Sequence, residues 1–396
     1  TGPQSIHILR GVRQQQDEPG RFSICSRQAA VVQVSKLYPP FWGGIETVVY
    51  DISTVLKQKD YDVDVLCVSE SNHSSREVMD NVNVYRCSSI VHMASTYISF
   101  EFIKVWRSIR NNYDVIHVHL PNPLALLAIF LFRPRRGCKI IVHWHSDIIK
   151  QKFLKIPFIP LQNSLLSNCD KIIATSQVYA NSSLDLKKYL NKVAIIPIGI
   201  DDKRMSIDVD RIKKIKNSYP GKLIVFSLGR HVYYKGFDYL IDAAKYLDDN
   251  YIIIIGGQGQ LTSSLNEKIS KYDLSKRVKL IGRINEEDVS SYFYAADIFC
   301  LPSIERSEAY GVVQLEAMAC GTPIISTDIS GSGVSWVNKH GVTGLVVKNK
   351  NPQELAKGIK YLSAHPFEKE HIQKYFMENY TRTKMVDCLI EVIKSA

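Results

Sequence analysis

The fold is decided most clearly by residues 297–326, which read DIFCLPSIERSEAYGVVQLEAMACGTPIIS. Within this stretch, residues 298–301 form an apolar run of strand length, residues 312–319 have the periodicity of a helix, and residues 323–326 begin a second strand. A strand, a helix and a strand in this order predict a parallel βαβ unit, because parallel neighbours need a crossover connection between them. The chain is therefore expected to have an α/β fold.

The same alternation extends over the rest of the chain in two successive series. The first series of expected strands comprises residues 30–34, 63–68, 82–86, 115–118, 140–142, 171–175 and 193–196. The second comprises strands at 223–228, 251–255, 278–281, 298–301 and 323–326, with helices at 237–246, 286–295 and 312–319. Near-continuous apolar strands are typical of parallel sheets that helices cover on both faces. We predict two tandem doubly wound domains that face a cleft, with ligand crevices at the carboxyl ends of their strands.

Residues 197–202, Pro-Ile-Gly-Ile-Asp-Asp, interrupt the pattern between the two series and indicate a linker. We expect an N-terminal domain at 29–200, a C-terminal domain at 201–375 and a last helix at 376–396 that returns to the N-terminal domain. Residues 1–28 are polar and aperiodic, so we expect them to be disordered or foreign to the native protein.

Composition narrows the class of protein. With 396 residues, 45% hydrophobic and 22% charged, the chain is neither collagen-like, nor a coiled coil, nor wholly disordered. Its net charge of +11 favours an acidic partner such as a nucleotide phosphate, an anionic lipid or a nucleic acid. No apolar run approaches the roughly 18–20 residues that span a bilayer, and no leader opens the chain. The eight cysteines are scattered, without a Cys-x-x-Cys pair, which predicts reduced thiols in a cytoplasmic protein.

The positive charge is concentrated in residues 101–160. There, Phe102, Trp106 and Ile109 recur at helical spacing between cations, and a second group of cations follows the apolar run 123–132. That group is Arg133, Arg135 and Arg136. Two interpretations remain open: a surface that rests on an anionic bilayer, or an ordinary core-facing helix with a solvated cationic face. No nucleic-acid-binding module accompanies the charge.

Two glycine-containing turns suit a phosphate. Gly43 and Gly44 lie between the first expected strand and a helix, where free N–H groups and the helix dipole attract anions, although a tight turn alone also favours glycine. Arg230 and Lys235 lie in the turn after the strand at 223–228. An arginine fork and a lysine charge can together neutralise a departing diphosphate.

Two carboxylates, Glu308 and Glu316, lie eight positions apart around the start of the helix at 312–319. Carboxylates accept hydrogen bonds from sugar hydroxyls, and the first N–H groups of the helix suit phosphate. A capping acid and a solvated surface glutamate would be the purely structural interpretation.

Glu308 to Glu316, followed by Ala-Met-Ala-Cys-Gly-Thr-Pro, resembles the Glu-x7-Glu signature of family-4 retaining glycosyltransferases. Three further segments are similar to motifs of that family: residues 197–201, Gly229-Arg230 with Lys235-Gly236, and 278–283 with Ala296-Asp297. The likeness covers about residues 29–395. It implies the GT-B fold, two Rossmann-like domains with the donor in the C-terminal one.

The resemblance also implies roles for particular residues. Glu308 would hold the hydroxyls of the donor sugar, and Glu316 those of the ribose. Backbone amides of four residues would hold sugar and phosphate: Tyr310, Gly311, Val312 and Val313. His145 resembles the histidine beside the reacting sugar carbon, and Ile284 is expected to contact the donor.

A metal site is not expected. His117, His119, His143 and His145 lie near one another in sequence, but His143 and His145 share a face only in an extended chain, and no cysteine or carboxylate spacing completes a tetrahedral set.

Other enzyme classes lack their motifs. The acidic triplets 62–64 and 208–210 are not placed at the carboxyl end of a strand, so they do not indicate the metal-binding Asp-x-Asp of single-domain glycosyltransferases. Residues 256–259, Gly-Gly-Gln-Gly, lack the third glycine of a dinucleotide fingerprint. P-loop and Gly-x-Ser-x-Gly motifs are missing as well.

The expected function is therefore retaining, metal-independent transfer of a hexose from GDP-mannose or a UDP-hexose to a saccharide acceptor. The similarity is greatest to bacterial enzymes that assemble O-antigen and capsule polysaccharide, carried by Trp-His-Ser-Asp at 144–147 and by residues 330–338. It implies a polyprenyl-diphosphate-linked acceptor and a peripheral position on the inner face of the cytoplasmic membrane. A sugar-nucleotide epimerase of the same fold and a non-catalytic nucleotide-sugar binder are the alternatives. The base, hexose and linkage stay open.

Overall fold

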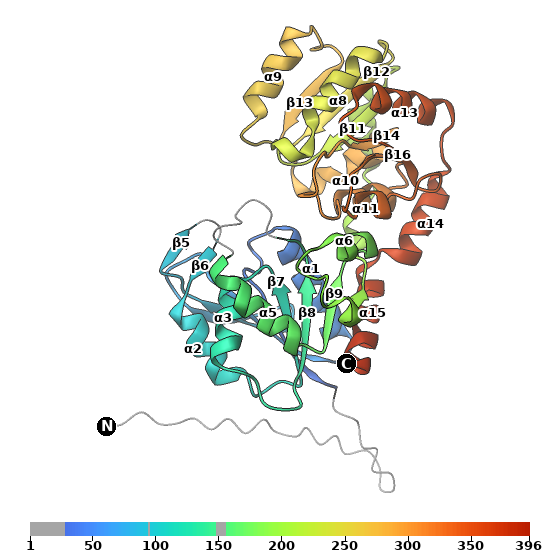
Figure 1. Cartoon of the computed structure of the whole chain (residues 1–396). Helices are drawn as coiled ribbons and strands as arrows, with labels where there is room; N and C mark the ends of the chain where they lie inside the picture. Colours follow the sequence, from blue (N-terminus) through green and yellow to red (C-terminus); the bar gives the residue numbers. More distant parts are fainter. Residues whose placement is uncertain (1–27, 94–95, 148–155) are drawn as a thin grey trace, which may run out of the picture.

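The computed structural model of the chain describes residues 28–93, 96–147 and 156–396. The expectations for residues 1–27, including Cys25, and for the cations Lys150, Lys152 and Lys155 lie outside the described residues. The chain forms two sheet-centred domains, one above the other in Figure 1.

The N-terminal sheet has eight strands, all parallel to their neighbours except β3, which is antiparallel to β4. In sheet order they are β10 (Val193–Ile195), β9 (Lys171–Ala174), β8 (Lys139–Trp144), β7 (Val115–Leu120), β1 (Ala30–Val34), β2 (Asp62–Val68), β4 (Val82–Cys87) and β3 (Ser75–Met79). A separate antiparallel pair consists of β5 (Val91–Met93) and β6 (Thr96–Ile98). The sequence interpretation missed β3, because this edge strand is largely exposed and has no apolar run.

The C-terminal sheet has six strands, all parallel. In sheet order they are β13 (Val278–Gly282), β12 (Tyr251–Gly256), β11 (Leu223–Leu228), β14 (Ile298–Leu301), β15 (Ile324–Asp328) and β16 (Gly344–Lys348).

Both sheets have the strand order of a Rossmann fold, so the predicted α/β class with two such domains is confirmed. The order reverses between β1 and β7 in one sheet and between β11 and β14 in the other. Loops leave such a switch point in opposite directions and open a ligand crevice there. The candidate residues follow three of these strands, β1, β11 and β14, and also β8 and β13.

Helices cover the faces of both sheets (Figure 1). In the N-terminal domain they are α1 (Gly44–Gln58), α2 (Phe100–Ile109), α3 (Pro123–Leu131), α5 (Ile159–Asn168) and α6 (Gln177–Ser182). From the linker onward they are α7 (Val209–Asn217), α8 (Phe237–Ala243), α9 (Thr262–Lys271), α10 (Glu286–Ala295), α11 (Val313–Ala319), α12 (Val334–Val337), α13 (Pro352–Ala364), α14 (Lys369–Asn379) and α15 (Arg382–Ser395).

Helix α2 shows which of the two interpretations of the basic segment applies to its own residues. The Ser99 side chain caps its first turn, and Phe102 and Trp106 are fully buried against the sheet, while Lys104 and Arg107 are exposed. The apolar stripe Phe102, Trp106 and Ile109 of α2 therefore belongs to the core, whereas its cationic face and Phe100 at its start are exposed.

The chain crosses between the domains twice. The first crossing is the linker, where the Ile200 N–H donates to the Tyr380 carbonyl and the Ile200 carbonyl accepts from the Arg382 N–H, both at 2.9 Å. A Cβ on Gly199 would lie 2.2 Å from the carbonyl oxygen of Thr381, so only glycine permits this approach. The second crossing leads into α15, which lies against α1 of the N-terminal domain (Figure 1).

No helix within the described residues is long and apolar enough to cross a membrane. The cysteines of the same ranges are free thiols, most of them buried.

Candidate active site

Lys235 and Glu308 meet at the switch point of the C-terminal sheet. Lys235 ends a 3-10 turn, Tyr233–Lys235, that follows β11, and Glu308 lies in the loop after the neighbouring strand β14. The Lys235 Nζ is 2.6 Å from the Glu308 Oε2, and only 13% and 11% of the two side chains are exposed. Ser303 Oγ donates a 2.9 Å hydrogen bond to the same carboxylate oxygen. Two predicted residues, 73 positions apart in sequence, thus form one polar centre.

Glycines shape the wall behind Lys235. The Cε of Lys235 lies 3.2 Å from the place that a Cβ on Gly229 would occupy. Gly257 has a φ of +114°, and a Cβ on it would lie 2.0 Å from the carbonyl oxygen of Gly229. Gly257, which belongs to the segment 256–259 that lacks the full dinucleotide fingerprint, therefore lets its loop pack against the loop of Gly229 beneath the lysine.

Arg230 leaves the same turn toward the surface. It is exposed, and its Nη2 lies 3.5 Å from the hydroxyl of Tyr234. The predicted contact of Arg230 with a diphosphate stays a prediction.

A cavity of about 400 Å³ lies between the two domains beside the linker. It is lined by Gly44 at the start of α1 and by Val312, Val313 and Glu316 of the signature helix. The helix begins one residue later than predicted, after a turn in which Gly311 has a φ of +75°. The structure thus brings predicted donor contacts from both domains to one cavity.

The side chain of Tyr310 does not face this cavity. It is buried, and its hydroxyl donates to the carbonyl oxygen of Ile198 in the linker at 3.3 Å. Only the backbone of Tyr310 can serve the role that the resemblance implies.

Several residues that line the cavity were not among the predicted site residues, and Arg283 and Trp42 are two of them. Arg283, exposed after β13, lines both this cavity and a neighbouring one of about 450 Å³ that includes Ile284. Trp42 lines the cavity from the N-terminal domain. The signal for Arg283 was its place at the end of a strand.

Glu46, in the first turn of α1, is also a residue that sequence reasoning missed. Its carboxylate folds back over Gly43, and burial raises its pKa above the ordinary value. The Glu46 carboxylate occupies the space beside Gly43, whereas nothing lies within 4 Å of the place that a Cβ on Gly44 would occupy, so Gly44 is the better placed of the two glycines. The sequence offered no signal for it, because an acid in the first turn of a helix is ordinary.

Four histidines form a stack on one face of the N-terminal sheet. His117 and His119 alternate along β7, and His143 of β8 pairs in register with His119. His145 follows the end of β8, and its ring lies 4.2 Å from that of His143, nearly parallel to it. The extended chain that the sequence argument treated as a condition is thus present, and β7 adds two more histidines to the same face.

Hydrogen bonds fix the orientation of His145. The Nε2 of His119 lies 2.8 Å from the Oε1 of Gln33, and its Nδ1 lies 2.9 Å from the Nε2 of His145. With the Gln33 oxygen as acceptor, His119 donates from Nε2 and accepts from the Nε2–H of His145. Burial lowers the pKa of His145 well below its ordinary value, so the ring is neutral near pH 7.

Ligand atoms of His117, His119 and His143 lie within 4.8 Å of one another. Ring nitrogens that share a zinc ion at about 2.0–2.1 Å must point toward a common centre. Here the ring of His143 is stacked against the rings of His117 and His119, at 23° to each. The described geometry is that of stacked neutral imidazoles, and independence of metal stays a proposal.

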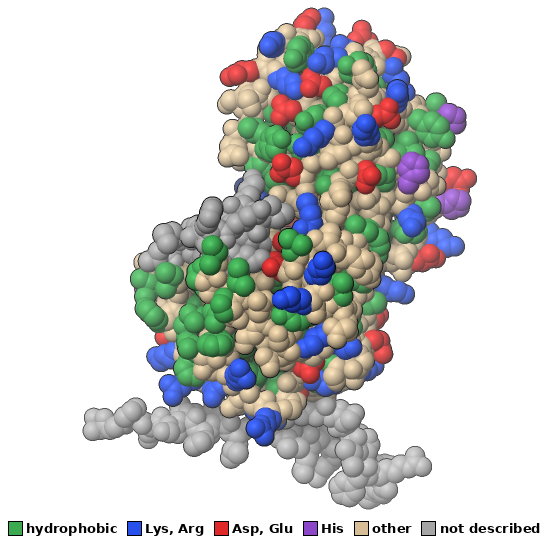
Figure 2. All heavy atoms as spheres, viewed as in Figure 1, with side chains coloured by type: hydrophobic (Ala, Val, Ile, Leu, Met, Phe, Trp, Pro, Cys, Tyr) green, Lys and Arg blue, Asp and Glu red, His purple; other side chains and the backbone are tan. Residues whose placement is uncertain are grey.

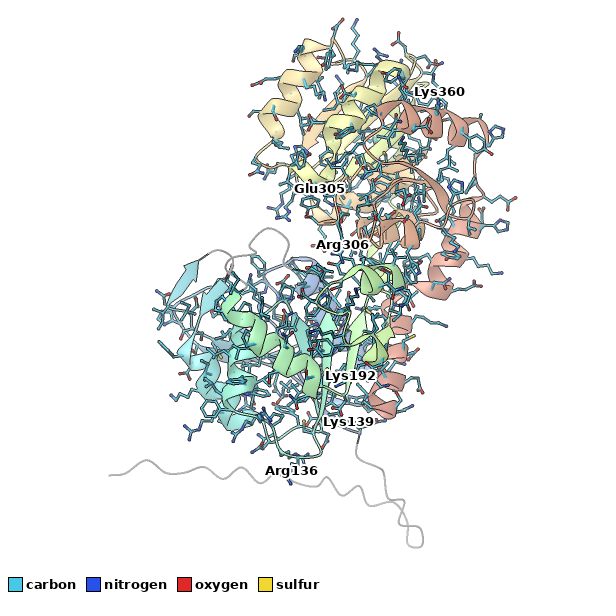
Figure 3. All side chains as sticks on the ribbon, in the orientation of Figure 1. Arg136, Lys139, Lys192, Glu305, Arg306 and Lys360 are labelled. Carbon is cyan, nitrogen blue, oxygen red and sulfur yellow. The ribbon has the colours of Figure 1, made fainter. Side chains whose placement is uncertain are left out.

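The facing surfaces of the two domains also contact each other directly. Figure 3 shows Glu305 and Arg306 on the side of the C-terminal domain that faces the N-terminal one. Ala309, next to Glu308, packs against the apolar cluster of the N-terminal domain. The candidate site is therefore shared between the domains.

Comparison with known proteins identifies the family. The model described as Glycosyltransferase Family 4 matches residues 42–204, and the one described as Glycosyl transferases group 1 matches residues 208–392. The chain is 30% identical over 359 residues to the O-antigen chain mannosyltransferase C of Escherichia coli, covering 90% of this chain and 95% of that protein. The chain belongs to glycosyltransferase family 4.

Further relatives agree with this family. D-rhamnosyltransferase WbpZ of Pseudomonas aeruginosa is 31% identical over 331 residues, covering 83% of this chain and 85% of the relative. Among solved structures, Anabaena HepE in complex with UDP and glucose superimposes with a TM-score of 0.73 at 18% identity, covering 93% of this chain and 100% of HepE. Sucrose-phosphate synthase of Thermosynechococcus elongatus gives 0.74 at 20% identity, covering 93% and 99%. These structures establish the GT-B fold.

Proposed function

We propose that this family-4 glycosyltransferase transfers a hexose from a nucleoside-diphosphate sugar to a saccharide acceptor with retention of configuration. The observation that carries the proposal is the Lys235–Glu308 pair at a switch point. Val312, four positions after Glu308, lines the interdomain cavity together with Gly44, Val313 and Glu316. Lys235 and Arg230 would bind the diphosphate, and Glu308 the hexose hydroxyls.

The chemistry follows from where charge develops. The bond between the anomeric carbon and the diphosphate oxygen breaks, and the diphosphate gains negative charge while the sugar becomes oxocarbenium-like. Lys235, Arg230 and the amides at 310–313 would stabilise that charge. The acceptor hydroxyl attacks from the face that the diphosphate leaves, and its proton passes to a phosphate oxygen of the leaving group. Neutral His145 would position the sugar.

The relatives favour one class of hexose. Two similar proteins are named for transfer of mannose and of D-rhamnose, which is 6-deoxy-D-mannose. A donor with the manno configuration, GDP-mannose before a UDP-hexose, is the donor we propose. The name of the first relative also supports a place in O-antigen assembly, as part of lipopolysaccharide.

A lipid-linked acceptor is supported by the surface of the N-terminal domain. Large apolar side chains of β6, α2, α3 and the segment around α5 are exposed on one side, which we call the apolar flank. They are Ile98, Phe100, Phe130, Leu131, Ile156 and Ile159. Figure 2 shows apolar side chains gathered on this side of the lower domain.

Cations border the apolar flank. Arg133, Arg135 and Arg136 line a cavity of about 170 Å³, which is also lined by Leu126, Leu165 and Phe130 of the flank. Apolar side chains beside cations are the pattern that binds an anionic bilayer surface. We propose that the flank lies on the inner face of the cytoplasmic membrane and receives a polyprenyl-diphosphate acceptor there.

Metal independence is also proposed, because Lys235, Arg230 and backbone amides supply the positive charge that a metal ion would otherwise give. Chelator-treated protein is then expected to keep its transfer rate.

The test is an assay of the full chain with a panel of GDP- and UDP-hexoses and a synthetic prenyl-diphosphate saccharide, before and after dialysis against EDTA. The expected result is one glycosylated acceptor whose new anomeric centre, read by NMR, matches the donor. An inverted product contradicts retention. Release of an epimeric sugar nucleotide without acceptor indicates an epimerase, and donor binding without turnover indicates a binding protein.

A further inference from the structure

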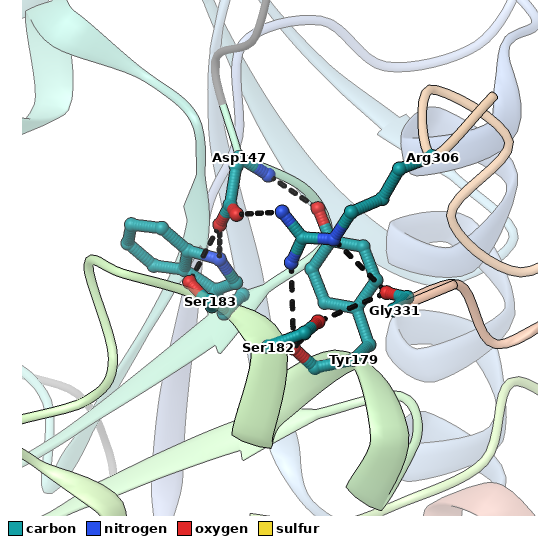
Figure 4. Close-up of polar contacts among 7 residues, drawn as sticks. Asp147, Tyr179, Ser182, Ser183, Arg306 and Gly331 are labelled. Atoms are coloured by element: carbon teal, nitrogen blue, oxygen red, sulfur yellow. Dashed lines mark hydrogen bonds and ion pairs between the residues drawn. The ribbon is translucent and has the colours of Figure 1, made fainter. Parts of the chain in front are cut away.

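An ion pair bridges the two domains at the candidate site (Figure 4). The Nη1 of Arg306, in the loop between β14 and α11, lies 2.7 Å from the Oδ2 of Asp147, which follows β8. The guanidinium stacks over the ring of Tyr179 with 4.4 Å to its centroid. Its Nε donates to the carbonyl oxygen of Gly331 at 2.9 Å. The guanidinium of Arg306 therefore contacts Asp147 and Tyr179 of the N-terminal domain and Gly331 of the C-terminal domain.

The N-terminal end of the bridge is held rigidly. The Oδ1 of Asp147 accepts from Trp144 Nε1 at 2.9 Å and from Ser183 Oγ at 2.7 Å. The Asp147 backbone N–H donates to the hydroxyl of Tyr179 at 2.7 Å. Because Asp147 comes two residues after His145, these bonds also fix the segment that carries His145.

The C-terminal end is tied to the loop of Glu308. Ser182 of α6 donates to the Gly331 carbonyl at 2.9 Å, the same oxygen that Arg306 uses (Figure 4). Ser332 Oγ donates to the backbone carbonyl of Glu308, and the Gly333 N–H donates to that of Ala309 at 2.8 Å. Arg306 itself precedes Glu308 by two residues.

We propose that Arg306 and Asp147 are positioning residues for glycosyl transfer, which set the separation between the His145 segment and the Glu308 loop across the cleft. The inference rests on the proposed function of the site. The reacting sugar would lie between groups from two domains, and the rate of transfer falls steeply when such groups are misplaced. A contact that joins both segments holds them in one geometry.

The chemistry of the pair suits this task. Side-chain exposure is 24% for Arg306 and 10% for Asp147, so solvent screens the attraction weakly. The arginine fork fixes direction as well as distance, which a lysine charge does not. Removing either partner alone leaves the other charge largely buried without its counterion.

The experiment compares Arg306→Gln, Asp147→Asn and the double variant in the full chain, with Lys268→Gln as matched control. Lys268 makes a 2.7 Å ion pair with Asp242 inside the C-terminal domain. For both single variants we expect kcat to fall about 10- to 100-fold while the KM for donor changes less than about threefold. The double variant should be no slower than the slower single variant, because the two residues act as one unit. Arg306→Lys should recover only part of the rate.

A second readout does not depend on activity. Small-angle X-ray scattering should give a larger radius of gyration for the variants than for wild type and the control, because the domains separate without the bridge. Unchanged scattering together with wild-type kcat overturns the inference. A KM for acceptor that is raised in Arg306→Gln but not in Asp147→Asn also overturns it, because Arg306 would then be a substrate contact. Failure of wild type to transfer any hexose contradicts the proposed function, and the scattering result then decides the bridge by itself.

Discussion

At the scale of single residues, the Lys235–Glu308 pair joins the two charges that the proposed reaction needs. A donor diphosphate would take Lys235 as its counterion, and the hexose hydroxyls would take Glu308. Each side chain is largely buried, so its charge acts strongly on a ligand beside it.

Neutral replacements of similar size test this pair. Glu308→Gln and Lys235→Met should each lower kcat by at least about 100-fold, the effect typical of losing one electrostatic contact to a transition state. Each single change should also lower the melting temperature, because the remaining partner keeps a buried charge, and the double variant should regain stability without regaining activity.

Steady-state rates and thermal unfolding provide both measurements. Glu267→Gln, an exposed acid of α9, is the control and should behave as wild type. A near-normal rate in either single variant would remove the assignment of that residue.

The residues of this centre were accessible from sequence because each sits in a short motif at the end of an apolar strand. Asp147 and Arg306 were not, since their contact joins positions 159 apart and no local spacing encodes it. Glu46 was missed for a different reason: an acid in the first turn of a helix is ordinary, and only packing reveals its burial.

At the scale of elements, the histidine stack on β7 and β8 carries a cost at acid pH. Burial lowers the pKa of His143 to about 3 and those of His117 and His119 well below their ordinary value. The unfolded chain therefore binds more protons than the native one below about pH 6.5. The contribution of the neutral histidines to the free energy of unfolding is fully present above that pH, and it is lost as the pH falls toward the native pKa values.

Thermal unfolding between pH 7.5 and pH 5 should show this loss, at up to about 1.4 kcal/mol per pH unit for each buried histidine. His143→Phe, which keeps a ring in the stack but cannot be protonated, should have a shallower dependence on pH. His73→Gln, at an exposed histidine of the same domain, should leave the dependence unchanged. Equal slopes for wild type and His143→Phe would mean that His143 does not stay neutral.

Elements were predicted best where an apolar run is bounded sharply. Leu223–Leu228, Ile298–Leu301 and Glu286–Ala295 have the bounds expected from the sequence. The helix expected at 237–246 instead ends at Ala243 and continues as a 3-10 turn. Apolar periodicity does not distinguish these two helical geometries.

At the scale of the whole molecule, the apolar flank and its cations predict how the protein meets a bilayer. Replacing Arg133, Arg135 and Arg136 by glutamine should abolish or strongly reduce pelleting with vesicles that contain anionic lipid, since each cation near such a surface contributes about 1 kcal/mol. Binding to neutral vesicles should be weak for every variant.

The control removes the same charge elsewhere. Glutamine at Lys213, Lys214 and Lys216, which are exposed on α7 of the C-terminal domain, should leave pelleting unchanged. Unchanged pelleting of the arginine variant would remove the membrane proposal, and equal losses in both variants would indicate net charge rather than a surface.

The double crossing of the chain affects how the C-terminal, donor-binding domain of one relative can be grafted onto the N-terminal domain of another. The Gln373 amide of α14 donates to the carbonyl of Ala319 at the end of α11, whereas in α15 the Ile393 carbonyl accepts from Lys139 and Asp387 pairs with Lys59. A chimaera spliced only at the linker would carry a foreign last helix onto α1. The exchangeable piece therefore has two junctions, one near Asp201 and one near Thr381, and leaves the final helix with its own acceptor half.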